Sequence, residues 1–333
     1  MKKYKNLVLI LILPFLGCNK DDISNDAMYF PSNNGSKWET KTIASLKWTE
    51  GAVADLKNYL IQTNTKSFMI LHKGKIVMEE YFDGHSQNTP WAWNSAGKTL
   101  VTATTGIAQQ EGLININTKV SHYLGAGWTS AGLAKENLIT SRHLLTMSSG
   151  LNDESNLVLK SNLTYLADAG TRWSYHNVFQ KLMDVVEKAS NQKFETYFET
   201  KLRNKIGMDG FWDNGLIFRI YNSNTRSMAR FGILALNKGK WQNEQIINEA
   251  FFNESTTTSQ DINPSYGYLW WLNGKSKYML PGSQKVTQSV LVPNAPSDMF
   301  AAMGAADQRL YICLLYTSPS PRDLSTSRMP SSA

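Results

Sequence analysis

The sequence predicts an α+β fold in which an antiparallel sheet, assembled from both ends of the chain, is flanked by helices and carries a helical insertion domain. Two β-rich runs joined by a turn signal lie near the N-terminus, helical periodicity fills the middle, and strand character returns near residue 300. The composition supports a globular domain, because 333 residues with 42% hydrophobic content can bury a substantial core.

The first expected element is a β-hairpin, within a domain that spans residues 41–314. Residues 67–70 and 75–82 favour strands, and the His-Lys-Gly sequence at 72–74 supplies the turn between them.

Helices are expected after the hairpin. Residues 95–111 contain no proline and place Leu100, Ile107 and small residues at helical spacing before Gly112. Shorter helices are expected at 144–147, 178–189 and 225–236. Residues 299–314 then return to strand character, with Gly304 inside this segment.

Residues 1–17 have the proportions of a secretory leader. Three lysines precede an apolar run at 7–15, which is too short to span a bilayer comfortably. The run ends at Gly17 and Cys18, which resemble a bacterial lipobox and imply a lipoprotein signal peptide that is cleaved before Cys18, with lipidation of its thiol. An ordinary cleaved leader or a short membrane anchor is the alternative.

Residues 18–40 are polar and are expected to tether the domain to the membrane through that lipid. At 19–22, the sequence Asn-Lys-Asp-Asp resembles the acidic export tag of Bacteroidetes lipoproteins. We therefore expect a cell-envelope lipoprotein at the outer membrane, displayed at the cell surface.

The domain is expected to be truncated at its C-terminus, where a tail of different composition, residues 315–333, begins. Its last eighteen residues include six serines and three prolines and show no helical periodicity. Residues 317–323 resemble translated cloning sequence, and a natural disordered tail is the alternative.

Charge and metal-ligand patterns exclude several classes of function. Removal of the leader lowers the formal net charge from +7 to +4, and no run of five basic residues exists, so nucleic acid is not an expected partner. Cys18 and Cys313 are the two cysteines, and the histidines lack metal-binding spacing. They are His72, His85, His122, His143 and His176. Neither a metal nor an organic cofactor is therefore expected.

Ser95 and Lys98 form an S-x-x-K element at the start of the first long helix. Their spacing of three places both side chains on one helical face, and the helix N-terminus directs backbone N–H groups towards Ser95. A serine hydroxyl needs an adjacent base, and a lysine can act as that base when burial lowers its pKa. Ser190 and Lys193 have the same spacing and are expected to mark a helix end.

A second element, Tyr175-His176-Asn177, precedes an apolar helix and strengthens the interpretation of Ser95 as a nucleophile. Tyr175 could relay protons between the nucleophile and the leaving group, and the Asn177 amide could hold both Lys98 and a substrate carbonyl. Without this element, Ser95 and Lys98 would equally fit a capped surface helix. A G-x-S-x-G elbow is absent at Ser95, which argues against an α/β-hydrolase.

With these motifs, residues 65–314 resemble the β-lactamase-related serine hydrolases, a family that includes class C β-lactamases, D-alanyl-D-alanine carboxypeptidases, penicillin-binding-protein-like esterases and nylon-oligomer hydrolases. Class A members of the family carry S-D-N, so the Y-x-N element points to the class C branch. Further matches are KGKIV at 73–77, GLIN at 112–115, RHLLTMSSGL at 142–151, GM at 207–208, ARFG at 229–232 and YGYLWW at 266–271.

The resemblance implies the serine β-lactamase/transpeptidase-like fold and an oxyanion hole formed by the N–H groups of Ser95 and Ala305. The family's third motif, K-T-G or H-x-G, falls at residues 302–304, where Gly304 is retained and Ala302 replaces the cation. We expect a small ester or amide substrate. The alternatives are a D-alanyl peptide or β-lactam hydrolase, and a non-catalytic surface binding lipoprotein of the same fold.

Five tryptophans lie near these motifs. They are expected to pack in the core or walls, and a subset could line an apolar acyl pocket. They are Trp91, Trp93, Trp173, Trp270 and Trp271.

The leader yields the first testable prediction, which is that the mature protein begins at a lipidated Cys18. Mass spectrometry of the N-terminal peptide from the native host is expected to show a diacyl or triacyl mass on Cys18, because more than one acyl chain is needed for stable anchoring. An unmodified terminus at another residue would contradict the prediction.

Overall fold

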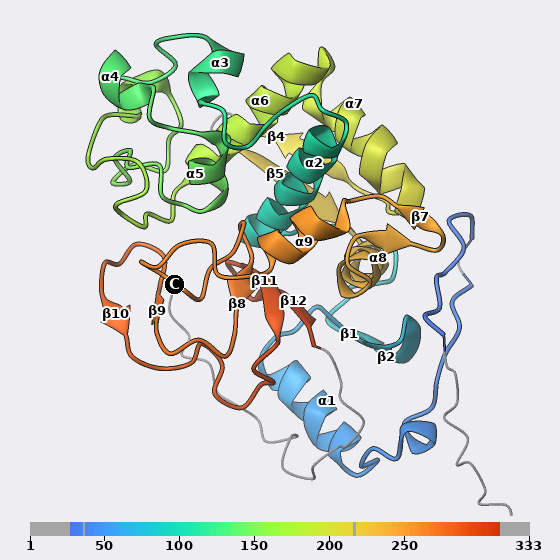
Figure 1. The fold of residues 1–333 in the computed structure, drawn as a ribbon. Helices are drawn as coiled ribbons and strands as arrows, with labels where there is room; N and C mark the ends of the chain where they lie inside the picture. Colours follow the sequence, from blue (N-terminus) through green and yellow to red (C-terminus); the bar gives the residue numbers. More distant parts are fainter. Residues whose placement is uncertain (1–26, 36, 216–217, 314–333) are drawn as a thin grey trace, which may run out of the picture.

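The computed structural model describes residues 27–35, 37–215 and 218–313 (Figure 1). The expected leader, the lipidation site Cys18 and the tail at 315–333 lie outside these residues. In the described part of the chain, no helix has both the length and the apolar character needed to cross a membrane.

The described elements alternate between helices and short strands. The α-helices are α1 (Ala52–Gln62), α2 (Lys98–Gln110), α3 (Val120–Leu124), α4 (Leu133–Glu136), α5 (Ser141–Leu145), α6 (Lys181–Ser190), α7 (Phe194–Phe198), α8 (Thr225–Leu236) and α9 (Glu249–Ser255). Shorter helical turns are η1 (Ala44–Leu46), η2 (Asn94–Gly97), η3 (Lys160–Asn162), η4 (Asn177–Gln180), η5 (Glu199–Arg203) and η6 (Asn204–Ile206). The strands are β1 (Ser67–His72), β2 (Lys75–Tyr81), β3 (Trp91–Ala92), β4 (Phe211–Asn214), β5 (Arg219–Ser223), β6 (Lys240–Trp241), β7 (Glu244–Gln245), β8 (Trp271–Leu272), β9 (Tyr278–Met279), β10 (Val286–Thr287), β11 (Phe300–Gly304) and β12 (Gln308–Ile312).

The predicted N-terminal hairpin is confirmed as the antiparallel pair β1–β2. Its turn needs a glycine, because Gly74 has a φ of +82° and a Cβ there would lie 1.9 Å from the Tyr29 carbonyl oxygen.

The predicted strand character of the C-terminal region is confirmed. Residues 299–314 contain two strands, β11 and β12, which pair antiparallel across a turn in which Ala306 and Asp307 have positive φ. β11 also pairs with β8, which gives the strand order β12–β11–β8. Among the described residues, this sheet shares no hydrogen-bonded ladder with β1–β2, so the strands from the two chain ends form separate sheets. Helix α8 contacts both β1 and β12 (Figure 1).

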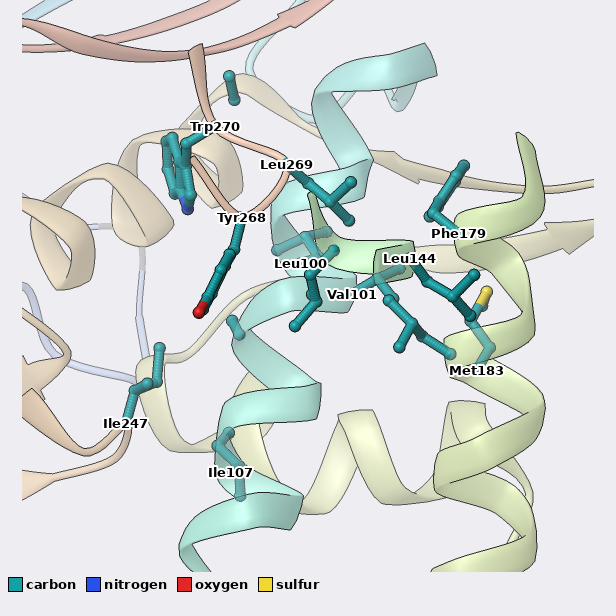
Figure 2. Packing of buried hydrophobic residues seen from close by; sticks show 14 of the residues in the cluster. Leu100, Val101, Ile107, Leu144, Phe179, Met183, Ile247, Tyr268, Leu269 and Trp270 are labelled. Carbon is teal, nitrogen blue, oxygen red and sulfur yellow. The ribbon is translucent and has the colours of Figure 1, made fainter. Parts of the chain in front are cut away.

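Helix α2 lies at the centre of the structure, and its residues 98–108 are all buried. It contacts α6 on one side and α9 on the other (Figure 1). Figure 2 shows Leu100, Val101 and Ile107 of this helix among core residues from several elements. A helix buried on every side is stabilised by tertiary packing more than by helix propensity, which is low for the threonines of α2.

Part of the predicted tether belongs to the domain. The Arg230 guanidinium, on a residue only 6% exposed, donates to the carbonyls of Pro31 and Ser32, and the Trp38 indole donates to the Gly74 carbonyl at 2.7 Å. A buried guanidinium needs acceptors, and this segment supplies them. The polar composition of residues 18–40 therefore did not mark the end of the folded structure.

Candidate active site

The backbone before Ser95 is held in an unusual conformation. Asn94 has a φ of +49°, a region that asparagine tolerates better than most residues, and its side-chain amide donates to the Ala305 carbonyl at 2.9 Å. Trp93 is 1% exposed, and its indole donates to Ser223 at 2.7 Å. These contacts fix the two residues before Ser95, which lies in η2, immediately before α2.

Lys98 contacts Ser95 directly, with 2.7 Å between its Nζ and the serine Oγ. The lysine is 4% exposed, and burial lowers its pKa from 10.5 to about 7. The ring centroids of Tyr175 and Phe179 lie 4.6 and 4.7 Å from Nζ. Ring faces favour the ammonium form, so they oppose the effect of burial. A substantial fraction of the amine can therefore be neutral at neutral pH.

Tyr175 shares the same small space. Burial raises its pKa to about 12, while the Ser95 hydroxyl and the positive charge of Arg309 act in the opposite direction. The phenol is thus protonated at neutral pH and can donate a proton. Its ring lies against three aromatic residues, Trp173, Tyr266 and Trp271.

The third predicted element also reaches Ser95. A Cβ at Gly304 would lie 2.5 Å from the Trp93 carbonyl oxygen and 3.0 Å from the Ser95 nitrogen, so strand β11 approaches the nucleophile as closely as only glycine permits. Ala305 follows, tied to Asn94 through its carbonyl. The backbone N–H groups of Ser95 and Ala305 therefore belong to segments in direct contact.

Asn177 does not have the predicted contact with Lys98. Its amide nitrogen donates to the Asn156 carbonyl at 3.1 Å, and the neighbouring His176 contacts the Ser155 carbonyl through Nε2. The carbonyl groups of residues 155 and 156 come close to His176 and Asn177 only in the folded chain. The Y-x-N pattern therefore could not reveal that one of them, and not Lys98, is the partner of Asn177.

Sequence reasoning missed two residues of the site, Asn94 and Phe179. Asparagine before the S-x-x-K element was a usable signal, because a turn into a helix often needs a residue that tolerates positive φ. The sequence gives no comparable signal for Phe179. An apolar residue after the Y-x-N element predicts a buried face of η4, but not a contact with Lys98.

The other predicted features have structural roles or remain outside the site. Ser190 ends α6, and Asn191 after it has a φ of +53°, which confirms that the second S-x-x-K marks a helix end. Trp91 is 43% exposed, whereas Trp93, Trp173, Trp270 and Trp271 are all buried. In the part of the chain that the structure describes, no group of three or more His, Cys, Asp or Glu side chains could hold a metal.

Comparison with known proteins gives matches to one family. A sequence model of the Beta-lactamase family matches residues 58–297. A Bacillus anthracis protein, provisionally described as a 6-aminohexanoate-dimer hydrolase, has a TM-score of 0.63 at 18% identity, covering 86% of this chain and 81% of its own. A Bacteroides dorei protein, provisionally described as a β-lactamase, has a TM-score of 0.61 at 13% identity, covering 83% and 87%. An uncharacterized protein of Alkalihalophilus pseudofirmus is 26% identical over 253 residues, 64% of this chain and 72% of its own.

The burial of Lys98 predicts a specific dependence of stability on pH. Between about 7 and 10.5 the unfolded chain binds a proton that the folded chain excludes, so stability should fall as the pH drops through this range and then level off below about 7. Lys98→Met should remove this penalty and raise the melting temperature. The gain should be largest at or below pH 7 and small near pH 11, and each unit of pKa depression corresponds to about 1.4 kcal/mol.

Calorimetry of both proteins across this pH range checks the prediction. Lys188→Met is the matched control, because Lys188 is an exposed lysine on α6 and should give a difference that does not depend on pH. Parallel pH curves for the wild type and Lys98→Met would contradict it.

Proposed function

The chain belongs to the β-lactamase-related serine hydrolase family, and from that premise we propose that it hydrolyses a small ester or amide through an acyl-enzyme intermediate on Ser95. The expected α+β fold of this family is confirmed by the family match and by the similar solved structures. The residues described above support a role for each group in the reaction.

Acylation begins when Ser95 Oγ attacks the substrate carbonyl carbon and passes its proton to the Lys98 amine. The negative charge that develops on the carbonyl oxygen is stabilised by the N–H groups of Ser95 and Ala305. Tyr175 then donates its phenolic proton to the leaving alcohol or amine as the carbonyl–heteroatom bond breaks, and Lys98 returns a proton to Tyr175.

Deacylation uses the same groups in reverse. A water molecule gives its proton to the neutral Lys98 amine, directly or through the Tyr175 hydroxyl, as its oxygen attacks the ester carbonyl, and Lys98 delivers the proton to Ser95 Oγ as the acyl–oxygen bond breaks. The acid product leaves, and the serine hydroxyl is restored. The observation that carries this proposal is the 2.7 Å contact between Ser95 and the buried Lys98, which gives the serine its base.

The surroundings of strand β11 favour a substrate without a carboxylate at the reacting end. Ala302 is fully buried, so a substrate meets no cation at the position that carries lysine or histidine in related enzymes. The nearest described cation of this strand pair, Arg309, donates to the Gly304 carbonyl and to the Asp307 carboxylate. The provisional description of the Bacillus anthracis protein as a dimer hydrolase is compatible with amide cleavage.

Arg309 also favours one alternative. The positive charge of Arg309 acts on Tyr175, so the guanidinium lies near the site. It is paired with Asp307, whose side chain is 90% exposed. If this ion pair opened, the guanidinium could bind a substrate carboxylate. A D-alanyl peptide or β-lactam is therefore the second candidate substrate class. We further propose that a lipid on Cys18 holds the enzyme at the outer membrane and displays it at the cell surface.

Ser95→Ala is expected to abolish turnover and labelling by a fluorophosphonate probe, because loss of a serine nucleophile lowers the rate on the order of 10⁴- to 10⁶-fold. Tyr175→Phe should lower kcat at least ~10²-fold, as expected for loss of a general acid. Both are measured with p-nitrophenyl esters beside Ser190→Ala, the matched serine that ends α6. Activity in Ser95→Ala equal to that of the wild type, or labelling of Ser190, would reject the site.

The choice between substrate classes is tested with short-chain p-nitrophenyl esters, small amides and nitrocefin. The wild type should have a higher kcat/KM for the esters, and Arg309→Met should affect the hydrolysis of esters and of nitrocefin by the same factor. A charge-assisted contact with a carboxylate contributes roughly 1.5–3 kcal/mol. Efficient nitrocefin hydrolysis that falls about tenfold or more in Arg309→Met would instead establish the second candidate, with Arg309 as the carboxylate anchor.

A further inference from the structure

The Tyr175 ring is oriented by aromatic packing. Rotation of a tyrosine ring about its last side-chain bond leaves the hydroxyl oxygen in place, so the position of that oxygen depends on the χ1 rotamer, which the atoms packed around the ring must hold. Trp271 lies nearly parallel to it, with centroids 5.9 Å apart and an interplanar angle of 29°. Trp173 is tilted at 6.0 Å, and Tyr266 presents its edge at 6.1 Å.

Of these three neighbours, Trp271 has a second connection to the site. It lies on β8, where its backbone pairs with Ala301 of β11. Three residues later on β11 is Gly304, which contacts the backbone of Ser95. One residue thus touches the proton donor with its side chain and the oxyanion strand with its backbone.

The turn before Trp271 is anchored to the nucleophile helix α2 and to helix α5. Thr102 of α2 donates to the Tyr268 carbonyl at 2.8 Å, and the Leu269 amide donates to the Leu145 carbonyl at 3.0 Å. Leu269 has a φ of +60°, and Tyr266 and Trp271 form a backbone bridge around the turn. The Trp271 ring therefore has little freedom of its own.

We propose that Trp271 is a positioning residue for the reaction, in which its indole face holds the Tyr175 hydroxyl in line with Ser95 and the leaving group. This inference rests on the proposed function of Ser95 and Tyr175. Trp271 transfers no proton in this role. Its packing keeps the Tyr175 side chain in one χ1 rotamer and keeps this tyrosine at a fixed distance from strand β11.

The chain supplies a matched control in the preceding residue. Trp270 is 1% exposed and Trp271 is 5% exposed, so both are buried tryptophans in one turn. Trp270 points into the core, where it lies beside Phe231 at 5.9 Å and Phe300 at 5.2 Å (Figure 2). Its replacement should cost comparable packing without reaching Tyr175.

The experiment compares Trp271→Leu, Trp271→Phe and Trp270→Leu with the wild type in steady-state ester hydrolysis, with rates normalised to the folded fraction. Trp271→Leu should lower kcat by about 10- to 100-fold, the loss expected from misplacing a catalytic group by around an ångström, while KM stays unchanged. Trp271→Phe should restore kcat to within about threefold, because a flat face is retained. Trp270→Leu should lose stability but keep the wild-type kcat.

Equal kcat values for Trp271→Leu and Trp270→Leu would overturn the proposal and leave Trp271 as a packing residue only. Should Trp271→Leu fail to fold, Trp271→Met takes its place and the same comparison applies. Wild-type activity that survives in Ser95→Ala would instead reject the proposed function itself, so the two failures are distinguishable.

Discussion

The burial of Lys98 beside Ser95 is the constraint on which the rest of the structure depends. A lysine in water is protonated and cannot accept the serine proton, so the fold must keep solvent away from one amine while leaving the adjacent hydroxyl accessible to substrate. Helix α2 meets the first requirement because it is buried from residue 98 to residue 108. The second is met by the placement of Ser95 in the turn before that helix.

Strand β11 meets the turn before α2, although the two are far apart in sequence. The contact between them leaves no room for a side chain at Gly304. In the proposed mechanism, the close approach of β11 supplies two backbone donors whatever side chain stands at position 302. Loss of the family's cation there would then change which substrates are recognised and leave the proposed oxyanion site in place. Under this proposal, substrate recognition by the side chain at 302 and catalysis by the backbone of β11 are independent.

Local patterns in the sequence predicted the features that depend on neighbours in sequence. The β1–β2 turn, the S-x-x-K spacing and helix α8 follow from a few adjacent residues, and the structure has each of them. The partner of Asn177 and the packing of the N-terminal segment on Arg230 depend on groups distant in sequence. A single sequence does not show which distant residues are in contact. For this reason, polar composition predicted a tether around Ser32, where the chain packs on the domain.

The proton affinity of Lys98 follows from two opposing effects of the same aromatic residues. Tyr175 and Phe179 exclude water and so lower the pKa, yet their ring faces stabilise the ammonium. A shift from 10.5 to about 7 corresponds to roughly 5 kcal/mol, whereas a desolvated cation–π contact contributes about 2 kcal/mol. Desolvation therefore dominates, but the rings limit its effect. An amine with a pKa near neutrality is partly neutral at pH 7, so it can accept the Ser95 proton as the carbonyl is attacked, and its ammonium form can return a proton to the Tyr175 phenolate. The proposed mechanism depends on this property, because acylation and deacylation would move the proton in opposite directions through the same lysine.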